Sequence, residues 1–177
     1  MRFGILSHVL TCDSSRGEIL RLRYLSQDQL DYVANQMCWK EGEPTSAIRI
    51  AVMHHHYLPT CLVEQMNAQK ASSVVYDAER LMQWLRKYHV QILLHGHKHR
   101  RFASVVGFPT ENEQLSCNFK NCTQTYVIGM GGTGAKNCEN TYGIIRFLAN
   151  SVEIDFYQIF CDNIQGDHLI QSIHIDI

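Results

Sequence analysis

Two short apolar segments constrain the fold of this chain most strongly, because each runs directly into histidines. Residues 47–53 precede three histidines at 54–56, and residues 90–94 precede the segment 95–99, which reads His-Gly-His-Lys-His. Mostly apolar runs of this length are typical of strands inside a sheet that is covered on both faces. The two segments are therefore predicted to be central strands that end in imidazoles.

The residues between these two strands have the pattern of a helix. From about 74 to 89, apolar side chains recur at helical spacing, at Ala78, Leu81, Met82, Leu85 and Tyr88. A strand, a helix and a strand in this order form a βαβ unit, in which the crossover is right-handed and the two strands are parallel. Both histidine groups should then lie at the same edge of the sheet, where open α/β folds gather their ligands.

Further elements are predicted on either side of this unit. Ser26 and Gln29 have the spacing of a capping box, and Leu25 and Leu30 that of a hydrophobic staple, so a helix should begin at Ser26. A short strand is expected within residues 3–12. The rest of the chain has strand patterns at 102–106, 126–130, 141–148, 152–159 and 169–175. We expect one α/β domain over residues 1–177, with a βαβ unit followed by a strand-rich tail.

Charge and cysteine content exclude several functional classes. Lys and Arg total 16 against 17 Asp and Glu, so neither nucleic acid nor an anionic membrane attracts the chain broadly. No apolar stretch approaches the length of a bilayer span, and the first residues lack the apolar region of a signal peptide. The seven cysteines are an odd number without a C-x-x-C pair, which favours reduced thiols. We expect a cytoplasmic protein.

A glycine-rich segment at 129–134 satisfies G-x-G-x-x-G, the dinucleotide-binding fingerprint. That fingerprint needs a helix to begin at its third glycine, whereas residues 141–145 have the pattern of another strand. We therefore interpret the segment as a glycine-rich turn at the rim of the sheet.

The histidines themselves indicate a metal site. Imidazole suits zinc, iron, nickel and copper, and Gly96 lets the backbone turn so that His97 and His99 can face one cavity. The alternative from the residues alone is a set of loop histidines at strand ends.

In these segments the sequence resembles the calcineurin-like metallophosphoesterases. The motif blocks of that family run D-x-H, G-D-x-x-D, G-N-H-[DE], a strand-end histidine often written H-H-P, and G-H-x-H. Residues 50–59 are similar to the fourth block, and residues 94–99 to the fifth. The resemblance implies a layered α/β/β/α sandwich, and a hydrolase for phosphomono- or phosphodiesters with two divalent metal ions, Mn, Fe or Zn. It further implies that His54 and His97 bind one ion, that His99 binds the other, and that His55 orients a ligand or faces the substrate.

The first three blocks of the family have no counterpart in this sequence. The bridging aspartate and the other amino-terminal ligands are therefore missing, and three neutral imidazoles cannot hold two divalent ions at the separation that joint activation needs. We expect the chain to be the carboxyl-terminal portion of such a domain, inactive alone, whose partners are a phosphate-ester substrate and the missing amino-terminal half. Two alternatives stay open: a non-catalytic remnant or split-domain partner that binds another chain, and a single zinc ion held by His54, His97 and His99.

Overall fold

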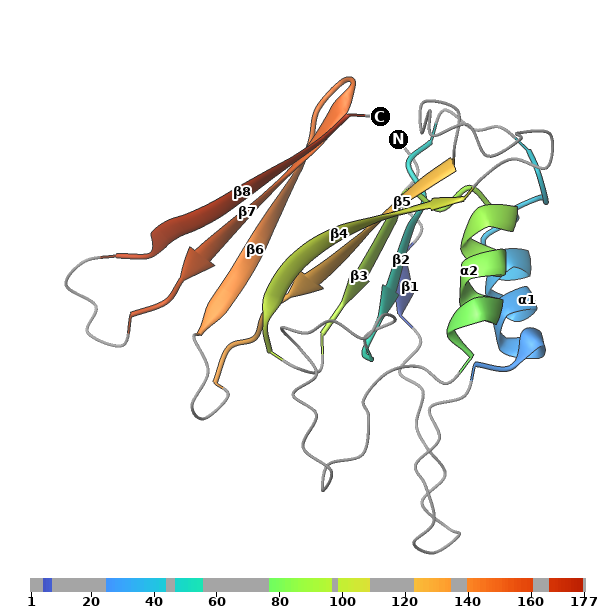
Figure 1. Ribbon diagram of the computed structural model, residues 1–177, viewed down its shortest axis with the longest axis horizontal. Coiled ribbons are helices and arrows are strands. Elements are labelled where there is room, and N and C mark those ends of the chain that lie inside the picture. The colour runs from blue at the N-terminus through green and yellow to red at the C-terminus, as the bar shows by residue number, and fades with distance from the viewer. Residues whose placement is uncertain are drawn as a thin grey trace, which may run out of the picture.

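The computed structural model describes residues 5–7, 25–43, 47–55, 77–96, 99–108, 123–134, 140–160 and 166–176. Within these ranges the chain forms two helices and eight strands, arranged in three layers (Figure 1). In chain order they are β1 (Ile5–Ser7), α1 (Gln27–Gln36), β2 (Ile50–Met53), α2 (Ala78–Lys87), β3 (Ile92–His95), β4 (Arg101–Phe108), β5 (Thr123–Met130), β6 (Thr141–Phe147), β7 (Ser151–Gln158) and β8 (His168–Asp176).

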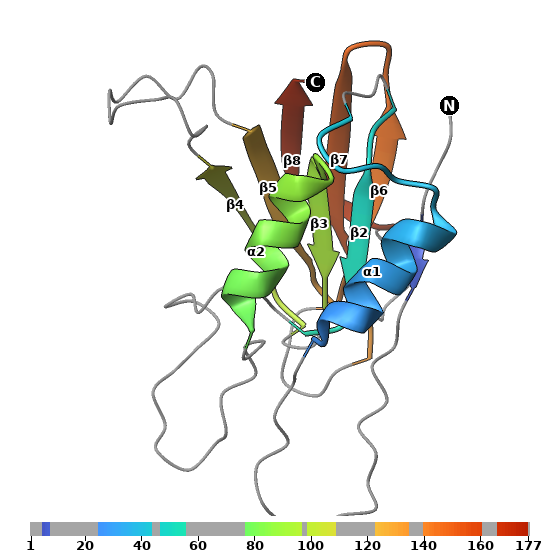
Figure 2. The same ribbon diagram turned by 90° about the vertical axis from the view of Figure 1, so that its right-hand side faces the viewer.

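The larger sheet has the strand order β1-β2-β3-β5-β4. Its first four strands are parallel, and β4 is antiparallel to β5. The predicted βαβ unit of β2, α2 and β3 is confirmed, with Ile50 opposite Ile92 and Met53 opposite His95. In Figure 2 the arrowheads of β2 and β3 lie at the same edge of the sheet.

Both helices pack on one face of this sheet, where they bury the first of two apolar clusters (Figure 2). The capping box predicted for α1 is present: the Gln29 amide donates to Ser26 Oγ at 3.2 Å, and the Ser26 amide donates to Gln29 Oε1 at 3.1 Å. Leu25 and Leu30, the predicted staple pair, are both buried in this cluster. Local sequence signals therefore set where α1 begins, and burial holds it on the sheet.

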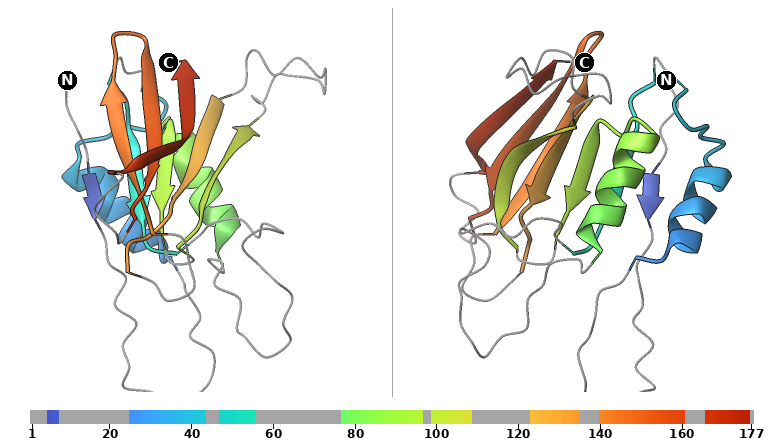
Figure 3. Two further views of the ribbon diagram at one scale, coloured as in Figure 1. Left: turned by 90° about the vertical axis from the view of Figure 1, so that its left-hand side faces the viewer. Right: turned by 45° about the vertical axis from the view of Figure 1, so that its right-hand side comes forward.

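The smaller sheet, with the order β6-β7-β8, is antiparallel and covers the opposite face of the larger one (Figure 3). Ile154 and Phe156 from β7 meet Leu94 and Ile128 from the larger sheet in the second apolar cluster. Because all four residues of β3 are buried, the prediction of a strand covered on both faces is confirmed.

The α/β class and the strand-rich tail are confirmed, and the described residues supply three layers in the order α/β/β. The second helical layer of the implied sandwich is not among the described elements. Likewise, no helix in the described part of the chain is long and apolar enough to cross a membrane.

The face of the smaller sheet that points away from the larger sheet holds a buried carboxylate, Asp155, which is 4% exposed. It accepts a hydrogen bond from Ser172 Oγ at 2.6 Å and another from the Arg146 guanidinium. These two bonds, with Ser172 the larger cause, lower the pKa of Asp155 below its usual value. The carboxylate is therefore stabilised in its ionised form by the folded state.

The stability of the fold should depend on pH through Asp155. Since its pKa is lower in the folded than in the unfolded chain, it stabilises the fold above the unfolded pKa of about 3.9, and this contribution is lost as pH falls through the folded pKa. The melting temperature of Asp155→Asn should lie below that of the wild type at pH 7, and the gap should shrink below about pH 4. Ser172→Ala should show a smaller gap with the same trend. A gap that stays constant between about pH 7 and pH 2 would contradict this account.

Candidate metal centre

Three parallel strands end side by side at what we call the carboxyl edge. Met53 of β2, His95 of β3 and Gly129 of β5 lie at one level, because they are register partners across the three strands. The segments that follow them, 54–55, 96–99 and 131–134, therefore start from neighbouring positions. Strand pairing brings together residues that the sequence keeps far apart.

The segments after β2 and β3 are joined by a hydrogen bond. The Gly96 amide donates to the carbonyl oxygen of His54 at 3.2 Å. The His54 side chain is exposed, His55 is half-buried, and their ring centroids are 4.8 Å apart with a tilt of 55°. The segments that carry the two histidine groups thus begin side by side at one edge, as the βαβ prediction requires.

His95, the last residue of β3, is part of the core. It is 3% exposed, and its ring packs against Phe102 with centroids 4.9 Å apart. Gly129 makes room for this pair, since a Cβ atom at that position would lie 2.6 Å from Phe102 Cδ1. The first histidine of the His-Gly-His-Lys-His segment therefore anchors the strand end.

His99 lies against the glycine-rich turn that follows β5. Its side chain is exposed, and its backbone has a φ of 54°. A Cβ atom at Gly132 would lie 2.2 Å from His99 Nδ1. The carbonyl oxygen of Gly132 in turn accepts from the Thr141 amide at 3.0 Å, so the turn is tied to the start of β6. As predicted, the segment lies at the rim of the sheet, and the next described element is a strand.

The predicted ligands are only partly placed by the structure. His54, His55 and His99 follow the strands that end at the carboxyl edge, while His97 lies outside the described residues. Among the described residues, no group of three or more His, Cys, Asp or Glu side chains could hold a metal ion. Cys38, which is described, is an exposed thiol without a disulfide. The ligand set of His54, His97 and His99 stays a prediction.

The side chains described at this edge fit a metal site built from imidazoles better than a pair of ions bridged by a carboxylate. The described segments 54–55, 96, 99 and 131–134 contribute imidazoles and no carboxylate. Imidazoles suit a borderline divalent ion such as Zn²⁺. Two ions held together by a bridging carboxylate do not fit these segments alone, in agreement with the motif blocks that the sequence lacks.

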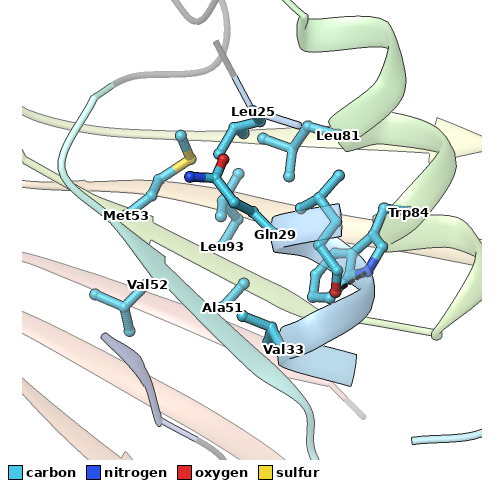
Figure 4. A pocket seen from close by; sticks show the side chains of 10 residues that line it. Leu25, Gln29, Val33, Ala51, Val52, Met53, Leu81, Trp84 and Leu93 are labelled. Atoms are coloured by element: carbon cyan, nitrogen blue, oxygen red, sulfur yellow. Dashed lines mark hydrogen bonds between the residues drawn. The ribbon is translucent and has the colours of Figure 1, made fainter. Parts of the chain in front are cut away.

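An apolar cavity of about 40 Å³ lies between the helices and the larger sheet (Figure 4). Leu25 and Gln29 from α1 and its start, Leu81 and Trp84 from α2, and Met53 of β2 line it. Gln29 Oε1 accepts from the Ser26 amide, and Trp84 Nε1 donates to the carbonyl oxygen of Leu30 at 3.0 Å. None of the described side chains that line it is ionisable, so it is a gap in the packing between the helices and the sheet.

No protein-family model matches this chain. The curated proteins contain no match either. Among solved structures, the chain is similar to Vps29 from Chaetomium thermophilum, with 12% identity, a TM-score of 0.39, and coverage of 76% of this chain and 57% of the other. Vacuolar protein sorting 29 from Cryptosporidium parvum matches with 14% identity, a TM-score of 0.35 and coverage of 58% and 46%. A single mutant of Vps29 from Entamoeba histolytica matches with 15% identity, a TM-score of 0.37 and coverage of 76% and 59%.

The chain spans about half the length of these three structures. At such TM-scores the likeness carries no information on activity, metals or partners.

Proposed function

We propose that this chain is the carboxyl-terminal portion of a metal-dependent phosphoesterase domain, and that His54, His97 and His99 are its share of the metal ligands. The observation that supports the proposal is the hydrogen bond from the Gly96 amide to the His54 carbonyl oxygen, which joins the two histidine segments at the carboxyl ends of parallel strands. Ligand sites in open α/β sheets lie at such edges.

The chemistry follows from the residue types. Divalent ions, Mn, Fe or Zn, would act here as Lewis acids on an oxygen of a phosphomono- or phosphodiester. His54 and His99 are exposed, so their rings can reach a ligand without unfolding a strand. His55 is half-buried beside His54, and in this proposal it would orient a ligand or face the substrate. The carboxylate ligands of a dinuclear centre would come from another segment or chain, so this chain alone should not hydrolyse phosphate esters.

A second candidate is a single zinc ion bound by the same three histidines. The described segments of the carboxyl edge hold imidazoles without carboxylates, which favours one ion over two. Three imidazoles with an open water position can support hydrolysis. This candidate differs from the first in that it needs no other chain.

Metal binding by the full chain is the direct test. Calorimetric titrations with Zn²⁺ and Mn²⁺ should show binding to the wild type. The affinity should be about 10- to 100-fold or more lower in His54→Ala, His97→Ala or His99→Ala. His168→Ala is the matched control, because His168 is exposed on β8 in the smaller sheet. Equal affinities for the wild type and all three ligand variants would reject the proposal.

Stoichiometry and turnover separate the two candidates. One zinc per chain with hydrolysis of a chromogenic phosphodiester, both lost in His99→Ala, would support the single-ion site. Metal binding without turnover, with activity appearing when an amino-terminal half carrying the acidic motif blocks is added with Mn²⁺, would support the divided domain.

A further inference from the structure

Three residues other than glycine have a left-handed backbone in the described part of the chain: Cys38 with a φ of 53°, His89 with 48° and His99 with 54°. Cys38 follows the C-cap of α1, and His89 follows the C-cap of α2. In both places the next amide closes the helix end, from Trp39 to the Ala34 carbonyl oxygen at 2.9 Å and from Val90 to that of Leu85 at 2.9 Å. These two conformations are those of ordinary helix ends.

His99 has no such explanation, because it follows a strand, β3. A left-handed backbone crowds the Cβ atom of any L-residue against the carbonyl group, so it lowers stability unless the surroundings hold it. Residues of this kind concentrate at functional sites. The conformation of His99 is therefore a feature that the fold maintains at a cost.

Gly132 forms the surface that His99 rests on. A Cβ atom at position 132 would lie 2.2 Å from Nδ1, 2.9 Å from Cγ and 3.0 Å from Cβ of His99, so that alanine there would force the ring to move. Gly132 is not among the glycines with a positive φ, which are Gly42, Gly131, Gly134 and Gly166. What glycine supplies at 132 is therefore space for the imidazole, and not backbone freedom.

The turn that carries Gly132 is fixed from the other side. The Thr141 amide donates to the Gly132 carbonyl oxygen at 3.0 Å, and the Gly134 amide donates to Asn140 Oδ1 at 2.8 Å. Both partners lie at the start of β6. The smaller sheet thereby holds the turn against the edge of the larger sheet.

We propose that Gly132 is a positioning residue for His99: the turn after β5 holds the imidazole with Nδ1 against the glycine, which leaves Nε2 as the nitrogen that binds the metal ion. That His99 binds a metal ion rests on the proposed function. The contact between Gly132 and His99 is independent of it. It adds the segment after β5 to those after β2 and β3 as the third part of the site.

Gly134→Ala is the matched control for Gly132→Ala. Both glycines belong to the same turn, but Gly134 has a φ of 83°, and a Cβ atom there would meet no other atom within 4 Å, so alanine brings backbone strain without a clash. Gly132→Ala should weaken Zn²⁺ binding at least about tenfold and shift the imidazole NMR signals of His99 in the metal-free protein. Gly134→Ala should lower the melting temperature while leaving the zinc affinity and those signals unchanged.

A second comparison works without metal. In the wild-type protein, Gly132→Ala should lower the melting temperature by about 2–4 °C or more. In the His99→Gly variant the same substitution should leave the melting temperature unchanged, because the imidazole that the new Cβ atom would contact is absent. His99→Gly alone should raise the melting temperature, since glycine accepts the left-handed backbone. An equal loss in both backgrounds, together with unshifted imidazole signals, would overturn the positioning role.

The two proposals fail in different ways. A wild type that binds no Zn²⁺ or Mn²⁺ would reject the proposed function, while the stability comparison would still decide whether Gly132 positions His99. A wild type that binds metal no more tightly than Gly132→Ala does would reject the positioning role alone.

Discussion

Replacing Phe156 by alanine is expected to lower the free energy of unfolding by about 3–5 kcal/mol. Phe156 is fully buried in β7, and it belongs to the cluster that joins the two sheets. Removing the ring deletes apolar contact and leaves a cavity between two layers that cannot both close on it. Urea denaturation followed by circular dichroism measures the change.

Two variants show whether the loss comes from this cavity. Phe160→Ala removes the same side chain where it is 40% exposed, and the free energy of unfolding should change by no more than about 0.5 kcal/mol. Phe156→Leu keeps most of the volume and should cost less than alanine does. A Phe156→Ala effect as small as that of Phe160→Ala would mean that the smaller sheet is not packed as described.

Replacing Arg49 by alanine is expected to lower the free energy of unfolding by about 2–4 kcal/mol. Arg49 is 6% exposed, and its guanidinium donates to the carbonyl oxygen of Tyr88 at the C-terminus of α2. It also lies over the Trp39 ring, 5.2 Å from the centroid. Burial lowers its pKa, an effect partly offset by the charge of Glu43. Alanine would leave the Tyr88 carbonyl without its donor and open a space beside Trp39.

The control for Arg49 is a cation near the same surface that makes little contact. Lys40 has a side chain that is 77% exposed and pairs with Glu43 at 3.8 Å, so Lys40→Ala should change the free energy of unfolding by less than about 1 kcal/mol. Arg49→Lys keeps the charge but loses the planar group over Trp39, and its stability should fall between the wild type and Arg49→Ala. Equal stabilities for Arg49→Ala and Lys40→Ala would show that the buried guanidinium is not a structural element.

Elements that depend on local signals could be predicted from the sequence. The capping box at Ser26 predicted the start of α1, and the two apolar runs with a helix between them predicted the parallel pair β2 and β3. The order of the sheet could not be predicted. β3 pairs with β5 and not with β4, the strand that follows it in the sequence. That choice depends on which faces are buried in the assembled fold, and no short segment carries the information.

The candidate site, too, has features that could be predicted from the sequence and features that could not. Strand-end histidines were visible as a pattern, and the structure places His54 and His99 after strands that end at one edge. The contact between Gly132 and His99 could not be predicted from the sequence, since it depends on the pairing of β3 with β5. His95 shows the opposite case: within the same histidine segment it packs in the core against Phe102, which only a partner strand could reveal.

Arg49 lies where β2 begins, and the histidines lie where β2 and β3 end, so a strand length separates them. The Arg49 carbonyl oxygen accepts hydrogen bonds from the amides of Gln91 and Ile92 at the start of β3, so the amino ends of the two strands are clamped together. Substitutions of the histidines at one end should therefore leave the hydrogen bonds at the other end intact. The fold should therefore stay stable when the side chains at the carboxyl edge are exchanged, because the contacts that join the amino ends of β2 and β3 do not involve them.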